Sequence, residues 1–212
     1  HAAPQKVIVD FAARRTQGID AAGIFARASY LAGFAGTSNV QAGKELRIPT
    51  FGTMAHSFIS SFPSELDAFR AYAATFPDDT TLLVDTYDTI QGVRNAITVA
   101  LELNSEGHRL VAVRLDSGDI LDLSGRARGM LDAAGLEYVR IFATGGLDEF
   151  SVERLVLDGA PIDGFGVGTK VGVSADAPWG DGVYKLVEYD GAPVLKLSTT
   201  KETLPGAKQI YR

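Results

Sequence analysis

Six short apolar runs, separated by segments of helical periodicity, constrain the fold of this chain more than any other feature of its sequence. Uninterrupted apolar runs of this length are typical of strands that are buried on both faces, as in a parallel sheet. The later runs begin roughly 25 to 35 residues apart, which is about the length of one strand–helix unit. We therefore predict strands at residues 7–9, 48–51, 82–84, 110–113, 139–142 and 164–167.

Helical patterns accompany the later strands, at residues 68–74, 89–103, 124–134 and 149–157. Within 89–103, Val93, Ala96 and Ala100 recur at helical spacing. This alternation predicts an α/β fold, and no Gly-x-Gly-x-x-Gly fingerprint follows the first strand. We expect an irregular, partly formed TIM-like αβ barrel over residues 1–182, although periodicity alone also allows an open doubly wound sheet.

The end of the chain has a different pattern. Two alternating segments flank Asp190-Gly191, a dipeptide that favours a two-residue turn between antiparallel strands. We predict a β-hairpin appended to the barrel, in a second region at residues 183–212.

Composition narrows the class of protein. There are 20 Lys and Arg against 26 Asp and Glu, and no dense basic cluster, so we expect neither a nucleic-acid nor a membrane partner. There is no cysteine, which excludes disulfides and thiolate metal sites. No apolar stretch approaches the ~20 residues of a membrane span, and no signal peptide is evident, so we expect a cytoplasmic protein. Because the first residue is not Met and a strand follows almost at once, we expect a piece of a longer chain.

Charged and glycine-rich residues gather just past the predicted strands. In parallel barrels the carboxyl ends of the strands build the active site, so these segments should converge on one mouth. They are residues 10–15, 52–57, 85–88, 114–119, 143–149 and 166–169.

Each of these segments also has a purely structural interpretation. Asp88 and Asp148 could cap the helices that follow them, and the glycines at 145–146 and 166–168 could form tight turns. Glycines between a strand and a helix also leave backbone N–H groups free for a phosphate. Arg114 and Asp116 share one face of a strand and could be a buried ion pair or a site for phosphate and ribose.

The histidines do not indicate a zinc site, because no His-x-x-x-His or comparable ligand set is present. His56 follows a Gly-Thr pair and is a candidate catalytic residue, whereas His108 lies in a loop without supporting context. The metal ligands remain unassigned. Several carboxylates facing phosphates could still hold Mg²⁺, which needs few protein ligands.

Seven segments occur in an order that resembles the nicotinate phosphoribosyltransferase family, within the type II phosphoribosyltransferases. The segments are Asp10-Phe-x-x-Arg14-Arg15, Gly36-Thr-Ser38-Asn-Val40, Gly52-Thr-Met-Ala-His56-Ser57, Asp85-Thr-Tyr-Asp88, Arg114-Leu-Asp-Ser-Gly-Asp119, Phe165-Gly-Val-Gly-Thr169 and Val183-Tyr-Lys-Leu186. The resemblance implies a homodimer with shared active sites and a family N-terminal domain that this sequence lacks. It also implies a reaction of NAD salvage, in which nicotinate and phosphoribosyl pyrophosphate give nicotinate mononucleotide and pyrophosphate with ATP and Mg²⁺.

The resemblance also implies roles for individual residues. His56 would be phosphorylated by ATP, and Asp85 would lie near the pyrophosphate and its metal. Arg114 and Asp116 would hold the ribose and phosphates. The substrate-binding residues would be Phe11, stacked on the pyridine ring, Arg14, Thr37 and Ser38, together with Gly145, Gly146, Gly168 and Thr169 around the 5′-phosphate.

Ser38 bears on the choice of substrate. Relatives that use nicotinamide look to have Asp at this place, where it accepts from the amide, whereas Ser tolerates a carboxylate. The alternatives are another type II phosphoribosyltransferase, acting on nicotinamide or quinolinate, and a non-catalytic barrel that binds phosphorylated metabolites.

Overall fold

The structure is a computed structural model that describes residues 2–178, 186–194, 204–206 and 208–209. The chain divides into two compact units, residues 1–176 and residues 177–212. The predicted boundary between residues 182 and 183 lies outside the described residues.

The first unit is built on one six-stranded sheet in which every neighbouring pair is parallel. The strand order is β2-β1-β6-β5-β4-β3. This confirms the predicted α/β class. The strands are β1 (Val7–Asp10), β2 (Gly36–Thr37), β3 (Thr81–Leu83), β4 (Ala112–Leu115), β5 (Arg140–Ala143) and β6 (Gly164–Val167).

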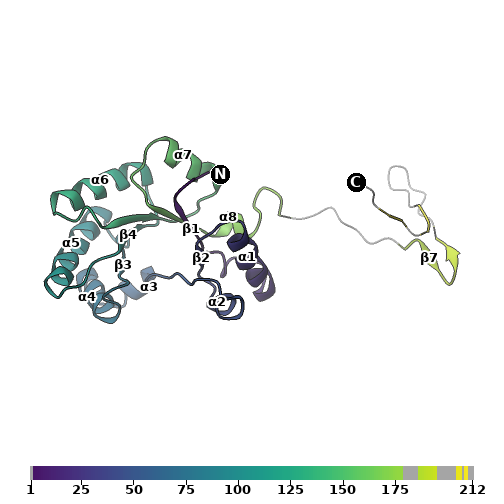
Figure 1. Cartoon of the computed structure of the whole chain (residues 1–212), viewed down its shortest axis with the longest axis horizontal. Helices are drawn as coiled ribbons and strands as arrows, with labels where there is room; N and C mark the ends of the chain where they lie inside the picture. The colour runs from purple at the N-terminus through teal and green to yellow at the C-terminus, as the bar shows by residue number, and fades with distance from the viewer. Residues whose placement is uncertain (1, 179–185, 195–203, 207, 210–212) are drawn as a thin grey trace. The chain divides into compact units, whose positions relative to one another are not determined.

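Helices follow the strands and, in Figure 1, α4 to α7 form an arc around them. Helix α4 packs on α5, and α5 packs on α6. The helices are α1 (Ile19–Leu31), α2 (Val40–Leu46), α3 (His56–Ile59), α4 (Glu65–Thr75), α5 (Thr89–Ser105), α6 (Ile120–Ala133), α7 (Glu149–Leu157) and α8 (Thr169–Gly172). The four predicted helices correspond to α4, α5, α6 and α7, whereas the sequence patterns did not indicate the other four.

Two of these helices begin at the aspartates that could be caps. Asp88 Oδ1 accepts the N–H of Gln91 at the start of α5, at 2.7 Å. Asp148 Oδ1 accepts the N–H of Ser151 in α7, at 2.8 Å, and the Ser151 hydroxyl accepts the N–H of Asp148 in return. Both residues therefore satisfy donors that the first helical turn leaves free.

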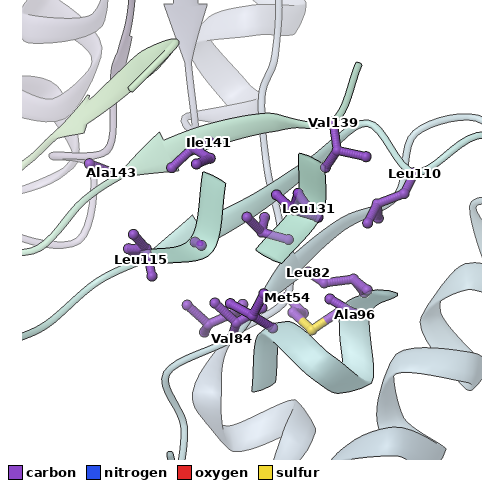
Figure 2. Packing of buried hydrophobic residues seen from close by; sticks show 14 of the residues in the cluster. Met54, Leu82, Val84, Ala96, Leu110, Leu115, Leu131, Val139, Ile141 and Ala143 are labelled. Carbon is purple, nitrogen blue, oxygen red and sulfur yellow. The ribbon is translucent and has the colours of Figure 1, made fainter. Parts of the chain in front are cut away.

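The core lies between the strands and this arc of helices. Figure 2 shows Ala96 of α5 and Leu131 of α6 among strand side chains such as Leu82, Leu115 and Ile141. All five are fully buried. The strand faces that meet the helices are thus apolar, which contributes to the apolar runs seen in the sequence.

The strand predicted at 48–51 is wrong. The second strand is instead β2, and the later segment makes only a single bridge, between Thr50 and Thr37. Two backbone hydrogen bonds flank it, from Thr37 N to Pro49 O and from Phe51 N to Thr37 O, both 3.0 Å. Pro49 has no N–H to donate, so the segment cannot continue a ladder.

This segment spans the space between the two edge strands of the sheet. Thr50 lies beside β2, while Thr53 accepts a hydrogen bond from Arg114 of β4 and Met54 joins the core cluster around Leu82. Among the described residues, no strand pairing joins β2 to β3. The sheet is therefore open at this point, in keeping with the expected partly formed barrel.

The second unit contains a short hairpin within its described part. Strands β7 (Glu188–Tyr189) and β8 (Ala192–Pro193) pair in antiparallel fashion. Asp190 and Gly191 between them have φ of 50° and 74°, as a type I′ turn requires. The predicted hairpin is confirmed at its turn, while the outer ends of its strands lie outside the described residues.

Within the described part of the chain, no helix combines the length and apolarity needed to cross a membrane.

Two glycines, one within α6 and one just past its end, give a first prediction. Gly129→Ala is expected to raise the free energy of unfolding by about 0.5–1 kcal/mol, because alanine loses less backbone entropy in a helix and a Cβ there meets open space. Gly135→Ala, just past the same helix, is expected to lower it by about 1 kcal/mol, because Gly135 has φ +71°. Urea unfolding of both variants checks this, and shifts of the same sign would contradict it.

Candidate active site

A cavity of about 700 Å³ opens where strands β1, β4, β5 and β6 end. Its wall also includes the segment that crosses between the sheet edges, at residues 52–57. This is the mouth at which the polar strand ends were predicted to converge. The lining residues are Phe11, Ala13, Arg14, Arg15, Ser38, Gly52, Thr53, Met54, Ala55, His56, Ser57, Arg114, Asp116, Thr144, Gly145, Gly146, Gly166, Gly168 and Thr169.

Of the twelve predicted site residues, all but Thr37 and Asp85 line this cavity. Both exceptions lie behind its wall. Sequence reasoning did not single out Thr53 or Thr144, although each stands in a strand-end segment that contains a chosen residue.

Thr37 is fully buried and makes a hydrogen bond to another buried residue, Asp10. Its hydroxyl donates to Asp10 Oδ2 at 2.6 Å, and Asp10 Oδ1 accepts the N–H of Ala12 at 2.7 Å. Burial raises the pKa of Asp10, and these two hydrogen bonds oppose that shift. In this structure Thr37 therefore helps to fix the loop that carries Phe11 and does not itself face the cavity.

Asp85 holds the turn that follows β4. Its Oδ2 atom accepts the N–H of Asp116 at 3.0 Å and the hydroxyl of Ser117 at 2.5 Å. The other oxygen, Oδ1, is buried and has no hydrogen-bond partner among the described residues. Asp85 thus supports Asp116 from behind and keeps one free acceptor.

Arg114 places a guanidinium beneath the cavity, with only 13% of its side chain exposed. Its Nη1 donates to Thr53 Oγ1 at 2.5 Å, and its Nη2 lies 3.9 Å from Asp116 Oδ1. Burial lowers the pKa of Arg114, while the carboxylates of Asp116 and Asp85 oppose that shift. Its Nε is buried without a partner in the described residues, so the group keeps donor capacity beyond a simple ion pair.

His56 and Asp116 face each other across the cavity wall. His56 begins α3, and its Nε2 lies 3.7 Å from Asp116 Oδ2. Its Nδ1 lies 3.1 Å from the hydroxyl of Thr86, a residue of the loop after β3. The hydroxyl of Thr144 donates to Asp116 Oδ1. The half-exposed imidazole thus faces a carboxylate, and each of these two groups also contacts a threonine hydroxyl, that of Thr86 for the imidazole and that of Thr144 for the carboxylate.

The two glycine turns lie side by side at the ends of β5 and β6. Gly145 and Gly146 have φ of 93° and 64°, a region that favours glycine. A Cβ on Gly166 would lie 2.6 Å from the ring of Phe11, so that glycine makes room for the aromatic side chain. Lys170 binds Asp148 Oδ2 at 2.6 Å, and this bond, with those from Ser151, holds the pKa of Asp148 well below its usual range.

The described residues contain no group of three or more histidines or acidic side chains arranged to hold a metal ion.

Glu65, at the start of α4, gives a pH-dependent prediction. It is buried, Asn95 donates to its Oε2 at 2.8 Å, and its Oε1 has no partner among the described residues. Burial raises the pKa of Glu65, and the hydrogen bond from Asn95 opposes that rise. The negative charges of Asp85 and Asp88 raise the pKa further. A carboxyl whose pKa is raised on folding contributes stability below its unfolded pKa and loses it as pH rises through the folded value.

Relative to Glu65→Gln, the wild type should therefore lose free energy of unfolding as pH rises above 4.5, the ordinary value for a glutamate. Urea unfolding at a series of pH values measures the difference, with the exposed Glu137→Gln as the control. Parallel pH profiles for Glu65→Gln and the wild type would contradict it.

Residues 7–172 match the family described as "Nicotinate phosphoribosyltransferase (NAPRTase) family". The nicotinate phosphoribosyltransferase pncB2 of Mycobacterium tuberculosis is 54% identical over 211 residues, which is 100% of this chain and 45% of that protein. The nicotinate phosphoribosyltransferase of Bacillus subtilis is 45% identical over 98% of this chain and 43% of its own length.

Solved structures agree with the sequence relatives. The crystal structure of human nicotinic acid phosphoribosyltransferase superposes with a TM-score of 0.76 at 32% identity, over 97% of this chain and 49% of the human one. The chain thus spans about half the length of the relatives that it matches.

Proposed function

Because this chain belongs to the nicotinate phosphoribosyltransferase family, we propose that it forms the catalytic cavity of an enzyme of NAD salvage. The reaction joins nicotinate to phosphoribosyl pyrophosphate and gives nicotinate mononucleotide and pyrophosphate. The observation that carries the proposal is the cavity itself, which combines a cation, a carboxylate, a histidine and two glycine turns at the ends of parallel strands.

In the proposed reaction, the pyridine nitrogen forms a bond to the ribose anomeric carbon, and pyrophosphate leaves with the electron pair of the broken C–O bond. Positive charge develops on the ribose, where the carboxylate of Asp116 would stabilise it. Arg114 would bind the phosphates, and its spare Nε–H supports that role. Phe11 would stack on the ring, and Ser38 in the cavity wall supports a substrate that carries a carboxylate.

We further propose ATP as a co-substrate that phosphorylates His56, and Mg²⁺ as the metal. Most ligands of this ion would be water and phosphate oxygens, so few protein carboxylates are needed. When bound, Mg²⁺ would neutralise charge on the leaving pyrophosphate. A homodimer with shared sites and a cytoplasmic location complete the proposal.

The test is product formation from phosphoribosyl pyrophosphate with nicotinate, nicotinamide or quinolinate, each with and without ATP. It is run on this chain and on the full-length protein that contains it. We expect nicotinate mononucleotide as the main product, at a rate that ATP raises. Conversion of quinolinate without ATP would replace the proposal with the alternative reaction. Binding of phosphoribosyl pyrophosphate without conversion of any of the three would indicate a non-catalytic barrel.

A further inference from the structure

Thr86 lies where its hydroxyl can restrain the imidazole ring of His56. It lies in the loop after β3, outside the cavity lining, and its hydroxyl is 3.1 Å from His56 Nδ1. The side chain of His56 is 44% exposed, so packing alone does not fix the orientation of its ring. A hydrogen bond to one ring nitrogen supplies that restraint.

The opposite ring nitrogen faces a carboxylate, and this decides which nitrogen carries the proton. His56 Nε2 lies 3.7 Å from Asp116 Oδ2, and an ionised carboxylate has only acceptors. A lone pair on Nε2 would face that negative charge, whereas an N–H would be attracted to it. In the neutral imidazole the proton is therefore favoured on Nε2, which leaves a lone pair on Nδ1.

The orientation of Asp116 is itself fixed from its other side. Its Oδ1 accepts the hydroxyl of Thr144 and lies 3.9 Å from Arg114 Nη2, so Oδ2 is the oxygen left to face the imidazole. Thr86 completes this series of hydrogen-bonding contacts, because a hydroxyl, unlike a carboxylate, can donate to the lone pair on Nδ1.

The loop that carries Thr86 is anchored on both sides. Asp85, directly before it, binds the N–H of Asp116 and the hydroxyl of Ser117, and Asp88, two residues after it, caps α5. Thr86 is thus held in place by the hydrogen bonds of Asp85 and Asp88 on either side of it.

We propose that Thr86 is a positioning residue that donates its hydroxyl hydrogen to His56 Nδ1 and so fixes the ring orientation and the Nε2–H tautomer of this histidine. Its effect on turnover rests on the proposed function, whereas the tautomer does not.

Two-bond ¹H–¹⁵N correlation NMR on histidine-labelled protein tests this, with His56→Gln used to assign the signal. The wild type should show the Nε2–H form of His56. Thr86→Val keeps the shape of the side chain and removes the donor, so both tautomers should appear. Thr86→Ser should restore the single form. The control is Thr98→Val, at an exposed threonine of α5, which should leave the spectrum unchanged.

In the activity assay, Thr86→Val should lower kcat about tenfold, as expected for one lost hydrogen bond, with KM for phosphoribosyl pyrophosphate unchanged and recovery in Thr86→Ser. An Nδ1–H tautomer in the wild type, or an unchanged tautomer in folded Thr86→Val, would overturn the proposal. If the wild type and the variants show the expected tautomers but none of them turns over substrate, the result would support the role of Thr86 and count against the proposed function.

Discussion

Replacing His56 with alanine is expected to remove all acid-labile phosphate that γ-labelled ATP transfers to this protein. In the proposed transfer, the bond between the γ-phosphorus and its bridging oxygen breaks and ADP leaves with the electron pair. A P–N bond forms at His56 Nε2, whose proton would pass to the Asp116 carboxylate beside it. A phosphoramidate of this kind is labile in acid and stable in base. Among the described cavity residues, His56 is the only imidazole, so its loss should take labelling to background.

The matched control is His108→Ala. His108 lies in a surface pair with Asp78, with 2.8 Å between its Nδ1 and the carboxylate, and does not line the cavity. Its removal should leave labelling unchanged. The label is counted after treatment with acid and with base, on the full-length protein with nicotinate and phosphoribosyl pyrophosphate present. Label that persists in His56→Ala would place the phosphate elsewhere. No label in the wild type would end the case for ATP coupling and favour the ATP-independent alternative.

The composition of the site could be predicted from sequence because parallel strands put their carboxyl ends at one edge. Arg114, Gly145 and Gly168 are far apart in the chain, yet each follows a buried apolar run by a few residues. The parallel alignment of neighbouring strands then brings these residues to one edge of the sheet. The positions of the strands in the sequence are therefore enough to predict that they meet.

Pairings between side chains could not be predicted in the same way. The contact of Thr86 with His56 joins a loop to a short helix, and the bond between Thr37 and Asp10 depends on the register of two strands. Such contacts are set by loop geometry that periodicity does not encode. For this reason Thr37 was expected in the cavity but lies behind it.

Helix α1 was missed for a related reason. Its large apolar residues Ile19, Ile24 and Leu31 are each at least 70% exposed, and its buried residues are the small Ala22, Ala26 and Ser29. The apolar positions therefore do not form the core-facing stripe that identifies an amphipathic helix. Close packing through small side chains leaves little periodic signal in a sequence.

Gly145→Ala is expected to lower the free energy of unfolding by about 3 kcal/mol. Gly145 has φ +93°, and a Cβ built on it would lie 1.8 Å from the backbone carbonyl oxygen of Asp116. That carbonyl cannot move freely, because Asp85 binds the N–H of Asp116 and Thr144 N donates to Leu115 O at 2.8 Å. The substitution therefore combines backbone strain with a clash against a fixed neighbour.

Gly146→Ala separates these two effects. Gly146 has φ +64°, but a Cβ there meets nothing within 4 Å, so strain alone should cost about 1 kcal/mol. Urea unfolding gives both stabilities, and calorimetric titration gives the affinity of each folded variant for phosphoribosyl pyrophosphate. Gly145→Ala should weaken binding at least about tenfold, or about 1.4 kcal/mol, because it displaces Asp116 from His56 and Thr144.

The two alanine variants also distinguish two ways in which this turn could contribute to phosphate binding. If the turn acted only by offering backbone N–H groups, the two alanine variants would weaken binding alike, since neither substitution removes an N–H. A larger loss in Gly145→Ala, in both stability and affinity, would mean that the end of β5 also shapes the position of the Asp116 carboxylate. Equal losses in the two variants would contradict that coupling and leave the turn as a simple anion cradle.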